Sequence, residues 1–388
     1  MSRTGAPAHR STRPHRRRRP AAAAALFLAA ATLLAGSVAL ATAKAVKTFH
    51  GGSSVVTALS LVPRLDTEDE YTEAWAFYAW LDGGYTAQVR FVATNLGPGE
   101  NNGTVEARIT TPDGRILRSH PNYKKDEWAH AADAFSLKMG ENIAGGGPTS
   151  YLVKVVGEGF GFSLTFKNTI APWAPRGGEV TFGDGPDAAS YHLNVMAPRA
   201  DVSGKVTVGG AVHAVRGSGY ADHTRTTLAS YKMAQSWDRF RGFTPTHTVE
   251  FLQFITPAKF GYRAVRWLLV AEGAHVVLTD FGYTLTRTDP RPDTVTSYGY
   301  KPPWGWTLSS VNPKGKVTGT IKATAMLVVN DWLAEMNPLE RAVIKGFAKP
   351  VVYDQRCSYE FKVELTGAPA PFTVTGSTDA CGSTFTNK

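Results

Sequence analysis

Period-2 alternation is clearest in residues 160–167, which read Phe-Gly-Phe-Ser-Leu-Thr-Phe-Lys. Large apolar side chains take every second position, so they share one face of an extended strand. The same alternation recurs in residues 85–94, 201–208 and 277–285, with turn-forming glycine, proline and aspartate between the segments. Each segment is typical of an antiparallel strand with one face on an apolar interior.

Helical patterns are sparse by comparison. Asn337 followed by Pro338 predicts a helix start, because asparagine caps helices and proline fits their first turn. That helix should continue to about Phe347 and end before Pro350, and residues 230–240 are a second short candidate. Many strands and few helices predict a mainly β chain of the sandwich or barrel class.

The N-terminal region holds most of the excess positive charge. Of 42 lysines and arginines in the 388 residues, seven arginines lie in residues 1–43, which leaves 35 basic against 32 acidic residues in the body. The body has no basic stripe, so a nucleic-acid partner is not predicted.

An apolar stretch follows Arg16–Arg19 and occupies Ala21–Ala43, ending in Ala-Thr-Ala. Basic, then apolar, then small is the order of a signal peptide. A helix of this length also spans about 34 Å, so an uncleaved membrane anchor is the alternative. Both predict an exported body, whether periplasmic, secreted or held at the membrane by this segment. Residues 44–70 are expected to be a linker, followed by domains at 71–228 and 229–388.

Cys357 and Cys381 are the two cysteines of the chain. In an exported protein such a pair is predicted to form a disulfide. Metal sites, phosphate loops, dinucleotide fingerprints and hydrolase motifs are missing from the sequence, so no metal and no organic cofactor is expected.

The most distinctive motif is Gly217–His223, which ends in Tyr220, Ala221, Asp222 and His223. A carboxylate beside an imidazole can fix its tautomer and raise its basicity, as acid–base catalysis requires. The alternative is a strand-end turn with a packed histidine. Glu272 is a weaker candidate for a second carboxylate, or else a solvated residue of a hairpin turn. The aromatic run 302–306 suits either a sugar platform or a barrel plug.

Residues 191–241 resemble a lipocalin-like superfamily that includes carotenoid hydratase (hydroxyneurosporene synthase), tocopherol-cyclase-like proteins and the yeast survival-factor family. The residues that carry the resemblance are Tyr191-His192, Val202–Val208, Val215–His223 and Trp237–Phe240, with Glu73–Gly84 as an opening strand. The resemblance implies two lipocalin-like antiparallel β-barrels around an apolar cavity. In the hydratase branch the histidine takes part in protonating an isoprenoid double bond, and a tryptophan follows two residues later. Arg225 stands at that position here, so the chain is nearest to the survival-factor branch, which implies lipid binding without chemistry.

The sequence therefore predicts a protein that binds or carries a hydrophobic lipid or isoprenoid in a barrel cavity. Two alternatives stay open: a hydratase- or cyclase-type enzyme that uses Asp222 and His223, and a glycan-binding β-sandwich. The residues expected to contact the ligand are Trp75, Trp80, Phe160, Phe162, Tyr191, Tyr220, Trp237 and Arg239.

Overall fold

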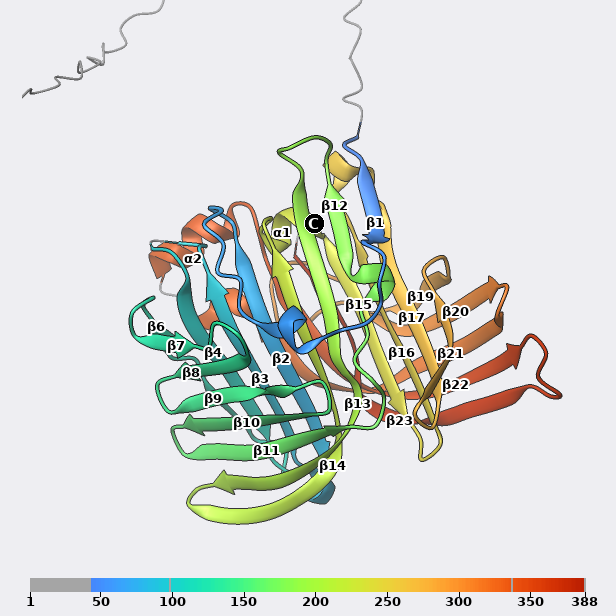
Figure 1. The fold of residues 1–388 in the computed structure, drawn as a ribbon, viewed down its shortest axis with the longest axis horizontal. Coiled ribbons are helices and arrows are strands. Elements are labelled where there is room, and N and C mark those ends of the chain that lie inside the picture. Colours follow the sequence, from blue (N-terminus) through green and yellow to red (C-terminus); the bar gives the residue numbers. More distant parts are fainter. Residues whose placement is uncertain (1–42, 98, 336–337, 387–388) are drawn as a thin grey trace, which may run out of the picture. The chain divides into compact units, whose positions relative to one another are not determined.

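Two antiparallel sheets dominate the computed structural model, which describes residues 43–97, 99–335 and 338–386 (Figure 1). The predicted mainly β, lipocalin-like class is confirmed. The expected signal peptide or anchor lies outside the described residues. No helix of the described part is long and apolar enough to cross a bilayer.

The first sheet has 14 strands and runs in the order β5-β4-β3-β2-β14-β13-β11-β10-β9-β8-β7, with β1, β12 and β6 paired beside this path. Its strands are β1 (Val46–His50), β2 (Thr72–Leu81), β3 (Thr86–Thr94), β4 (Asn102–Thr110), β5 (Ile116–Ser119), β6 (Asn122–Tyr123), β7 (Trp128–His130), β8 (Phe135–Met139), β9 (Asn142–Gly147), β10 (Ser150–Gly157), β11 (Phe160–Asn168), β12 (Glu179–Phe182), β13 (Ala189–Val208) and β14 (Ala211–Thr226).

The second sheet has nine strands in the order β18-β17-β16-β15-β23-β22-β21-β20-β19. Its strands are β15 (Ser236–Phe243), β16 (His247–Ile255), β17 (Ala264–Glu272), β18 (His275–Asp280), β19 (Thr284–Pro290), β20 (Pro303–Asn312), β21 (Gly315–Asp331), β22 (Val351–Leu365) and β23 (Phe372–Phe385). The two sheets fall on either side of the expected boundary at residue 228, which stays a prediction.

Two local expectations need correction. The alternation over residues 277–285 is divided between β18 and β19, because Asp280 accepts the backbone N–H of Gly282 and forms a turn between them. The helix expected over residues 230–240 is a single turn, α1 (Ser230–Met233), after which the chain enters β15. The other helix, α2 (Pro338–Lys345), begins at Pro338 as predicted and ends before Phe347.

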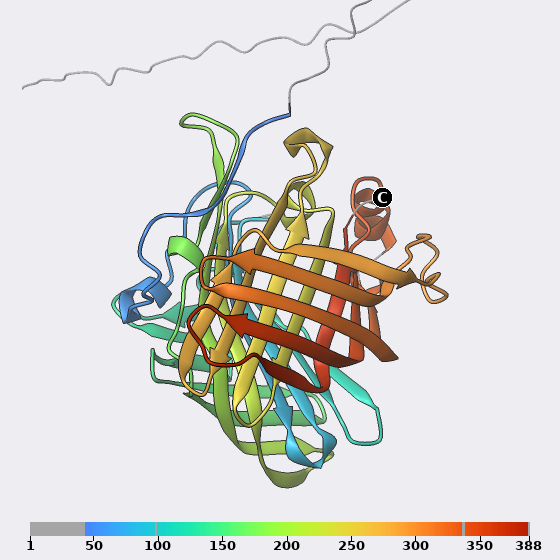
Figure 2. The same cartoon turned by 90° about the vertical axis from the view of Figure 1, so that its right-hand side faces the viewer.

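Each sheet curls so that its own two edges approach each other. In the first, Trp128 of β7 donates its indole N–H to the carbonyl of Asn101, just before β4, at 2.9 Å. In the second, Ser310 of β20 donates to Asp280 of β18 at 2.5 Å. Each sheet therefore has an inner and an outer face, and Figure 2 shows the curvature of the second.

Apolar side chains form three main layers. One fills the first barrel, one fills the second, and the third lies between the two sheets, where residues of β12, β13 and β14 contact residues of β16 and β17. Alternation along single strands produces this arrangement: Trp75 and Phe77 of β2 point into the first barrel, while Tyr78 and Trp80 point toward the second sheet.

Residues 44–70, expected to be a linker, pack closely on the body. Strand β1 pairs with β12, and the short 3-10 helix Ala58–Leu61 lies over one end of the first barrel, where Leu61 is completely buried. We call residues 56–66 the strap.

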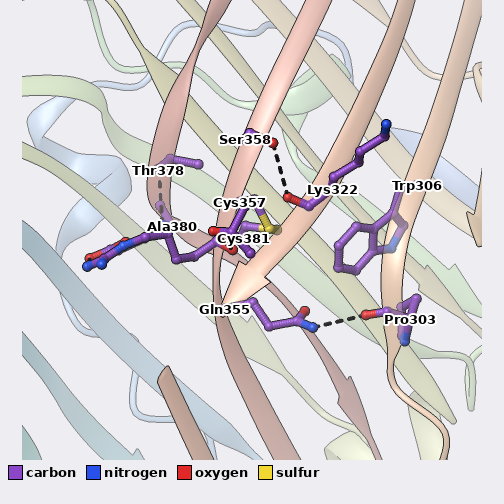
Figure 3. Close-up of a disulfide and its surroundings, with 12 residues drawn as sticks. Pro303, Trp306, Lys322, Gln355, Cys357, Ser358, Thr378, Ala380 and Cys381 are labelled. Carbon is purple, nitrogen blue, oxygen red and sulfur yellow. Dashed lines mark hydrogen bonds and ion pairs between the residues drawn. A yellow bond between two sulfur atoms is a disulfide. The ribbon is translucent and has the colours of Figure 1, made fainter. Parts of the chain in front are cut away.

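The predicted disulfide between Cys357 and Cys381 is present and joins the neighbouring strands β22 and β23 (Figure 3). Their Cα atoms are 6.1 Å apart, and both residues are buried in the second barrel beside Trp306 and Tyr359. The bridge closes a segment with a sequence separation of 24.

Replacing both cysteines with alanine is expected to lower the free energy of unfolding by about 3 kcal/mol, because the unfolded chain regains loop entropy. Urea unfolding of the oxidised protein and the double variant measures this difference. Reductant should lower the midpoint of the wild type and leave that of the variant unchanged. Two reactive thiols in the unreduced, denatured wild type would contradict the bridge.

Candidate functional site

Strand β14 places Asp222 and His223 on opposite faces of the first sheet. Asp222 is opposite Ala76 of β2, and His223 is opposite Trp75, so the two side chains alternate as in any regular strand. The expected orientation of His223 by Asp222 is therefore wrong, and each residue belongs to a different cluster.

The two glycines of the motif are required by close packing of β14. A Cβ on Gly217 would clash with the carbonyl oxygen of Trp80, and one on Gly219 would lie 2.5 Å from both Phe166 and Val202. The absence of a Cβ at Gly217 lets β14 pair closely with β2, and at Gly219 it leaves room for the side chains of Phe166 on β11 and Val202 on β13.

His223 and Glu73 form a buried pair inside the first barrel. His223 Nε2 lies 2.7 Å from Glu73 Oε1, both side chains are fully buried, and the imidazole stacks on Trp75 at a centroid distance of 4.8 Å. The other oxygen of Glu73 accepts hydrogen bonds from Tyr71 Oη at 2.8 Å and from the backbone N–H of Arg64 at 2.9 Å.

The pKa values of both members of this pair lie below their ordinary values. Burial alone would raise the pKa of Glu73, but the hydrogen bonds from His223, Arg64 and Tyr71 outweigh it and lower that pKa. Burial lowers the pKa of His223, and Glu73 offsets this only in part. The carboxylate therefore accepts from Nε2–H, which leaves Nδ1 facing the amide of Asn194 at 3.5 Å.

The strap seals this cluster from solvent. Its carbonyl groups at Ser60 and Leu61 accept hydrogen bonds from Asn194 and Trp75, at 3.0 and 3.1 Å. His223 is thus buried and already hydrogen-bonded to Glu73, as a structural histidine is. It is not open to a substrate, so its position does not favour the hydratase alternative.

A second polar cluster lies between the two sheets, on the other face of β14. Arg241 of β15 lies 4.0 Å from Asp222, and its guanidinium sits over the ring of Tyr220 at 3.5 Å from the centroid. Glu250 of β16 is opposite Arg241 across the strand pair and is completely buried. We call Tyr220, Asp222, Arg241 and Glu250 the inter-sheet cluster.

Hydrogen-bonding capacity is left over in the inter-sheet cluster. Among the described residues, neither oxygen of Glu250, nor Tyr220 Oη, nor Arg241 Nε has a hydrogen-bond partner. Burial raises the pKa of Glu250 well above its ordinary value, and Arg241 lowers it only in part. The same balance of burial against Arg241 raises the pKa of Asp222. Buried polar groups without partners are rare in folded proteins, and four such atoms gather in this cluster, which makes it the candidate polar site of the layer.

The structure separates the residues expected to contact a ligand. Trp75, Phe160 and Phe162 fill the first barrel, whereas Tyr191, Tyr220, Trp80 and Trp237 lie between the sheets. Arg239 pairs with Asp354 within the second sheet. Asp354 also binds Arg108 of β4 at 2.6 Å, so Asp354 joins the two sheets. Glu272 is exposed at the end of β17 and belongs to neither cluster.

Sequence reasoning missed Glu73, Arg241 and Glu250. A usable indication was present for two of them. Glu73 is in phase with Trp75 and Phe77 on an apolar strand face, and Glu250 interrupts the apolar run of β16. A charged residue at an inward-facing position of a strand needs a partner, and that requirement follows from the amino-acid pattern alone.

Two curved antiparallel sheets packed outer face to outer face, with buried polar groups between them, define a tandem lipocalin-like protein. The model of the Svf1 family matches residues 64–376, which is most of the chain. The protein belongs to the Svf1 family.

Relatives agree with this assignment. The chain is 24% identical over 326 residues to the ceramide-binding protein svf1 of Emericella nidulans, covering 79% of this chain and 84% of that protein. Crystal structures of a Nitrosomonas europaea protein assigned as AttH and of kievitone hydratase from Nectria haematococca superpose with TM-scores of 0.60 and 0.51. They are 12% and 14% identical, and the matches cover 88% and 87% of this chain and 98% and 97% of theirs, so they show the fold alone.

Proposed function

We propose that the protein binds a long-chain lipid with a small neutral head group, of the ceramide class, between its two sheets. The observation that carries the proposal is the inter-sheet cluster, in which buried polar atoms without partners are surrounded by apolar walls. The family and its ceramide-binding relative support the same ligand class.

The head group of such a lipid matches the cluster chemically. An amide and two hydroxyls offer donors and acceptors without net charge. A protonated Glu250 both donates and accepts, Arg241 donates, and Tyr220 does either. A cationic head group would be repelled by Arg241, and an anionic one would be repelled by the carboxyl groups of Asp222 and Glu250, whereas a neutral head group meets neither repulsion.

The tail would lie along β16 toward Phe254. From Glu250 to Phe254 the strand spans about 14 Å, and Leu252, Tyr191 and Trp237 line that path. Ten buried methylenes contribute roughly 8 kcal/mol before the cost of ordering the ligand. The aromatic side chains, such as Trp237 at 4.4 Å from Phe254, would have to shift to admit the tail.

The barrel interiors and the surface fit this ligand less well. The first barrel is apolar, as predicted, and is filled by its own side chains. Hollows of about 400 and 310 Å³ are open to solvent, and charged residues such as Glu70 and Glu100 in the first and Asp82 and Arg216 in the second form part of their linings. Trp306 of the expected sugar platform is buried and donates to Asp238 at 2.9 Å, which disfavours the glycan alternative.

A fluorescent long-chain ceramide is expected to bind with micromolar or better affinity, and soluble oligosaccharides should not compete. Glu250→Gln should bind almost as well, since glutamine keeps a donor and an acceptor. Glu250→Leu should bind about ten- to a hundredfold more weakly, because a buried polar group of the lipid loses its partner. Fluorescence titration measures all three proteins.

His223→Gln is the matched control for that titration, because His223 lies on β14 beside Asp222 but faces the first barrel. Its affinity should stay within about threefold of the wild type, as expected for one neutral hydrogen bond that does not touch the lipid. Equal losses in His223→Gln and Glu250→Leu would contradict the inter-sheet location, and saturable glycan binding without lipid binding would contradict the function.

A further inference from the structure

One end of the molecule combines exposed aromatic and basic side chains at the point where the described chain begins. The backbone N–H of Lys44 donates to the carbonyl of Lys259 at 2.8 Å. Lys259 belongs to the turn between β16 and β17, residues 257–263, which we call the tip. In both views the tip lies at the same end as β1, α1 and α2 (Figures 1 and 2).

Tyr262 projects from the tip into solvent. It is 59% exposed and has a φ of 54°, a left-handed conformation that non-glycine residues seldom adopt. The turn is held by backbone hydrogen bonds from Phe260 and Gly261 to Pro257 and Ala258, at 2.9 and 2.8 Å. Exposed tyrosines are enriched at the membrane–water interface, where the ring contacts the apolar side and the hydroxyl contacts water.

Basic side chains lie on the tip and on the neighbouring helix α1. Lys259 and Arg263 are exposed, and Lys232 of α1 pairs with Glu70. Burial lowers the pKa of Lys259, and so does repulsion from Lys232 and Lys44, whereas Glu70, which pairs with Lys232, opposes this shift.

Other residues at this end complete the surface. Phe347 is 50% exposed and contacts Tyr231 of α1 at 5.2 Å between ring centroids. Asp184 and Asp187 lie on the neighbouring β12–β13 turn, and their carboxylates reduce the positive charge of this end. Aromatic residues flanked by lysine and arginine are the usual composition of a membrane-contacting surface.

The tip is also continuous with the apolar layer between the sheets. Phe260, next to Lys259, is buried and packs on Phe182 of β12 at 5.2 Å. Along β16 the tip lies beyond Phe254, at the far end of the path proposed for the lipid tail. A lipid could therefore pass from a bilayer at the tip into that layer without crossing the polar surface.

We propose that the tip docks on an anionic lipid bilayer, with Tyr262 in the interfacial region and Lys44, Lys259 and Arg263 on the head groups. The position of Ala43 supports this orientation, because its side chain lies near Gly261 of the tip and the apolar segment is predicted to end at this residue. The role of the tip as the site of lipid uptake rests on the proposed function, while docking itself does not.

The test uses the full chain with Tyr262→Cys carrying an environment-sensitive fluorophore. The native cysteines are bridged and buried, so the label reacts at the new position. Vesicles containing phosphatidylglycerol should shift its emission to the blue, and a high salt concentration should remove the shift. Adding Lys259→Gln and Arg263→Gln should weaken partitioning about twenty-five-fold, since each surface charge contributes about fivefold.

Val212→Cys is the control position, because Val212 is 60% exposed in the β13–β14 hairpin at the opposite end of both views. Its label should not respond. Equal responses at the two positions, no response at residue 262, or the same response with phosphatidylcholine vesicles would overturn the proposal. Soluble short-chain ceramide, titrated without vesicles, should bind the Lys259→Gln, Arg263→Gln protein normally. Absence of vesicle docking with soluble ceramide still bound would contradict this inference alone. Vesicle docking without ceramide binding would contradict the proposed function alone.

Discussion

Glu73→Ala is expected to lower the free energy of unfolding by about 3–5 kcal/mol, which is the usual cost of removing one partner from a buried charged network. The change leaves Tyr71 Oη, His223 Nε2 and the backbone N–H of Arg64 without their acceptor inside the first barrel. Urea unfolding measures the loss. Amide hydrogen exchange should locate it, with faster exchange in the strap than in β10 and β11.

Glu106→Ala is the control on the same sheet. Glu106 pairs with Arg90 at 2.6 Å, and both side chains are partly exposed, at 21% and 32%, so the expected loss is smaller than for Glu73→Ala. If Glu73→Ala costs no more than Glu106→Ala, the Glu73 network does not hold the strap.

Glu250 is expected to behave in the opposite way, since its side chain costs stability in the unliganded protein. Glu250→Leu should raise the free energy of unfolding by about 1–3 kcal/mol, because a buried carboxyl group without partners is replaced by an apolar one. The same variant is expected to lose ceramide affinity. A gain in stability combined with a loss of binding is characteristic of a residue kept for a ligand.

The pH dependence of stability provides a second measurement on Glu250. The unfolded chain releases this proton near the ordinary pKa of 4.5, while the folded protein retains it to higher pH. Stability contributed by the protonated form is therefore complete below that value and is lost as the pH rises through the raised pKa. Asp222 acts in the same direction. The difference between wild type and Glu250→Gln isolates Glu250, and a difference independent of pH would contradict a protonated side chain.

The fold was accessible from the sequence because alternation is a local property. The strands around residues 85–94, 160–167 and 201–208 needed no knowledge of their partners, and neither did the helix start at Pro338. The helix expected beyond Met233 failed because residues 236–240 alternate between two buried faces, so the interior of the second barrel and the layer between the sheets override helical spacing.

The site was only partly accessible for the same reason. Asp222 and His223 are neighbours in sequence, which suggested one functional pair, yet a strand turns consecutive side chains to opposite faces. Their true partners, Arg241 and Glu73, come from other strands, and Glu73 is 150 residues from His223. Such long-range pairing depends on strand order, which no local pattern contains.

The strap has a consequence for how the chain matures during synthesis. Strand β1 pairs with β12, Ser60 bonds to Asn194 and Glu73 bonds to His223. Residues 43–66 are therefore synthesised more than a hundred residues before the strands on which they pack. At 5–20 residues per second this interval lasts roughly 7–30 s. During it the apolar stretch before Ala43 is attached to unfolded chain, and cellular factors that recognise nascent polypeptides meet it with no neighbouring structure in the way. Once β14 is complete the strap can dock, whereas the hydrogen bond from Lys44 to Lys259 forms only after the tip has also been synthesised.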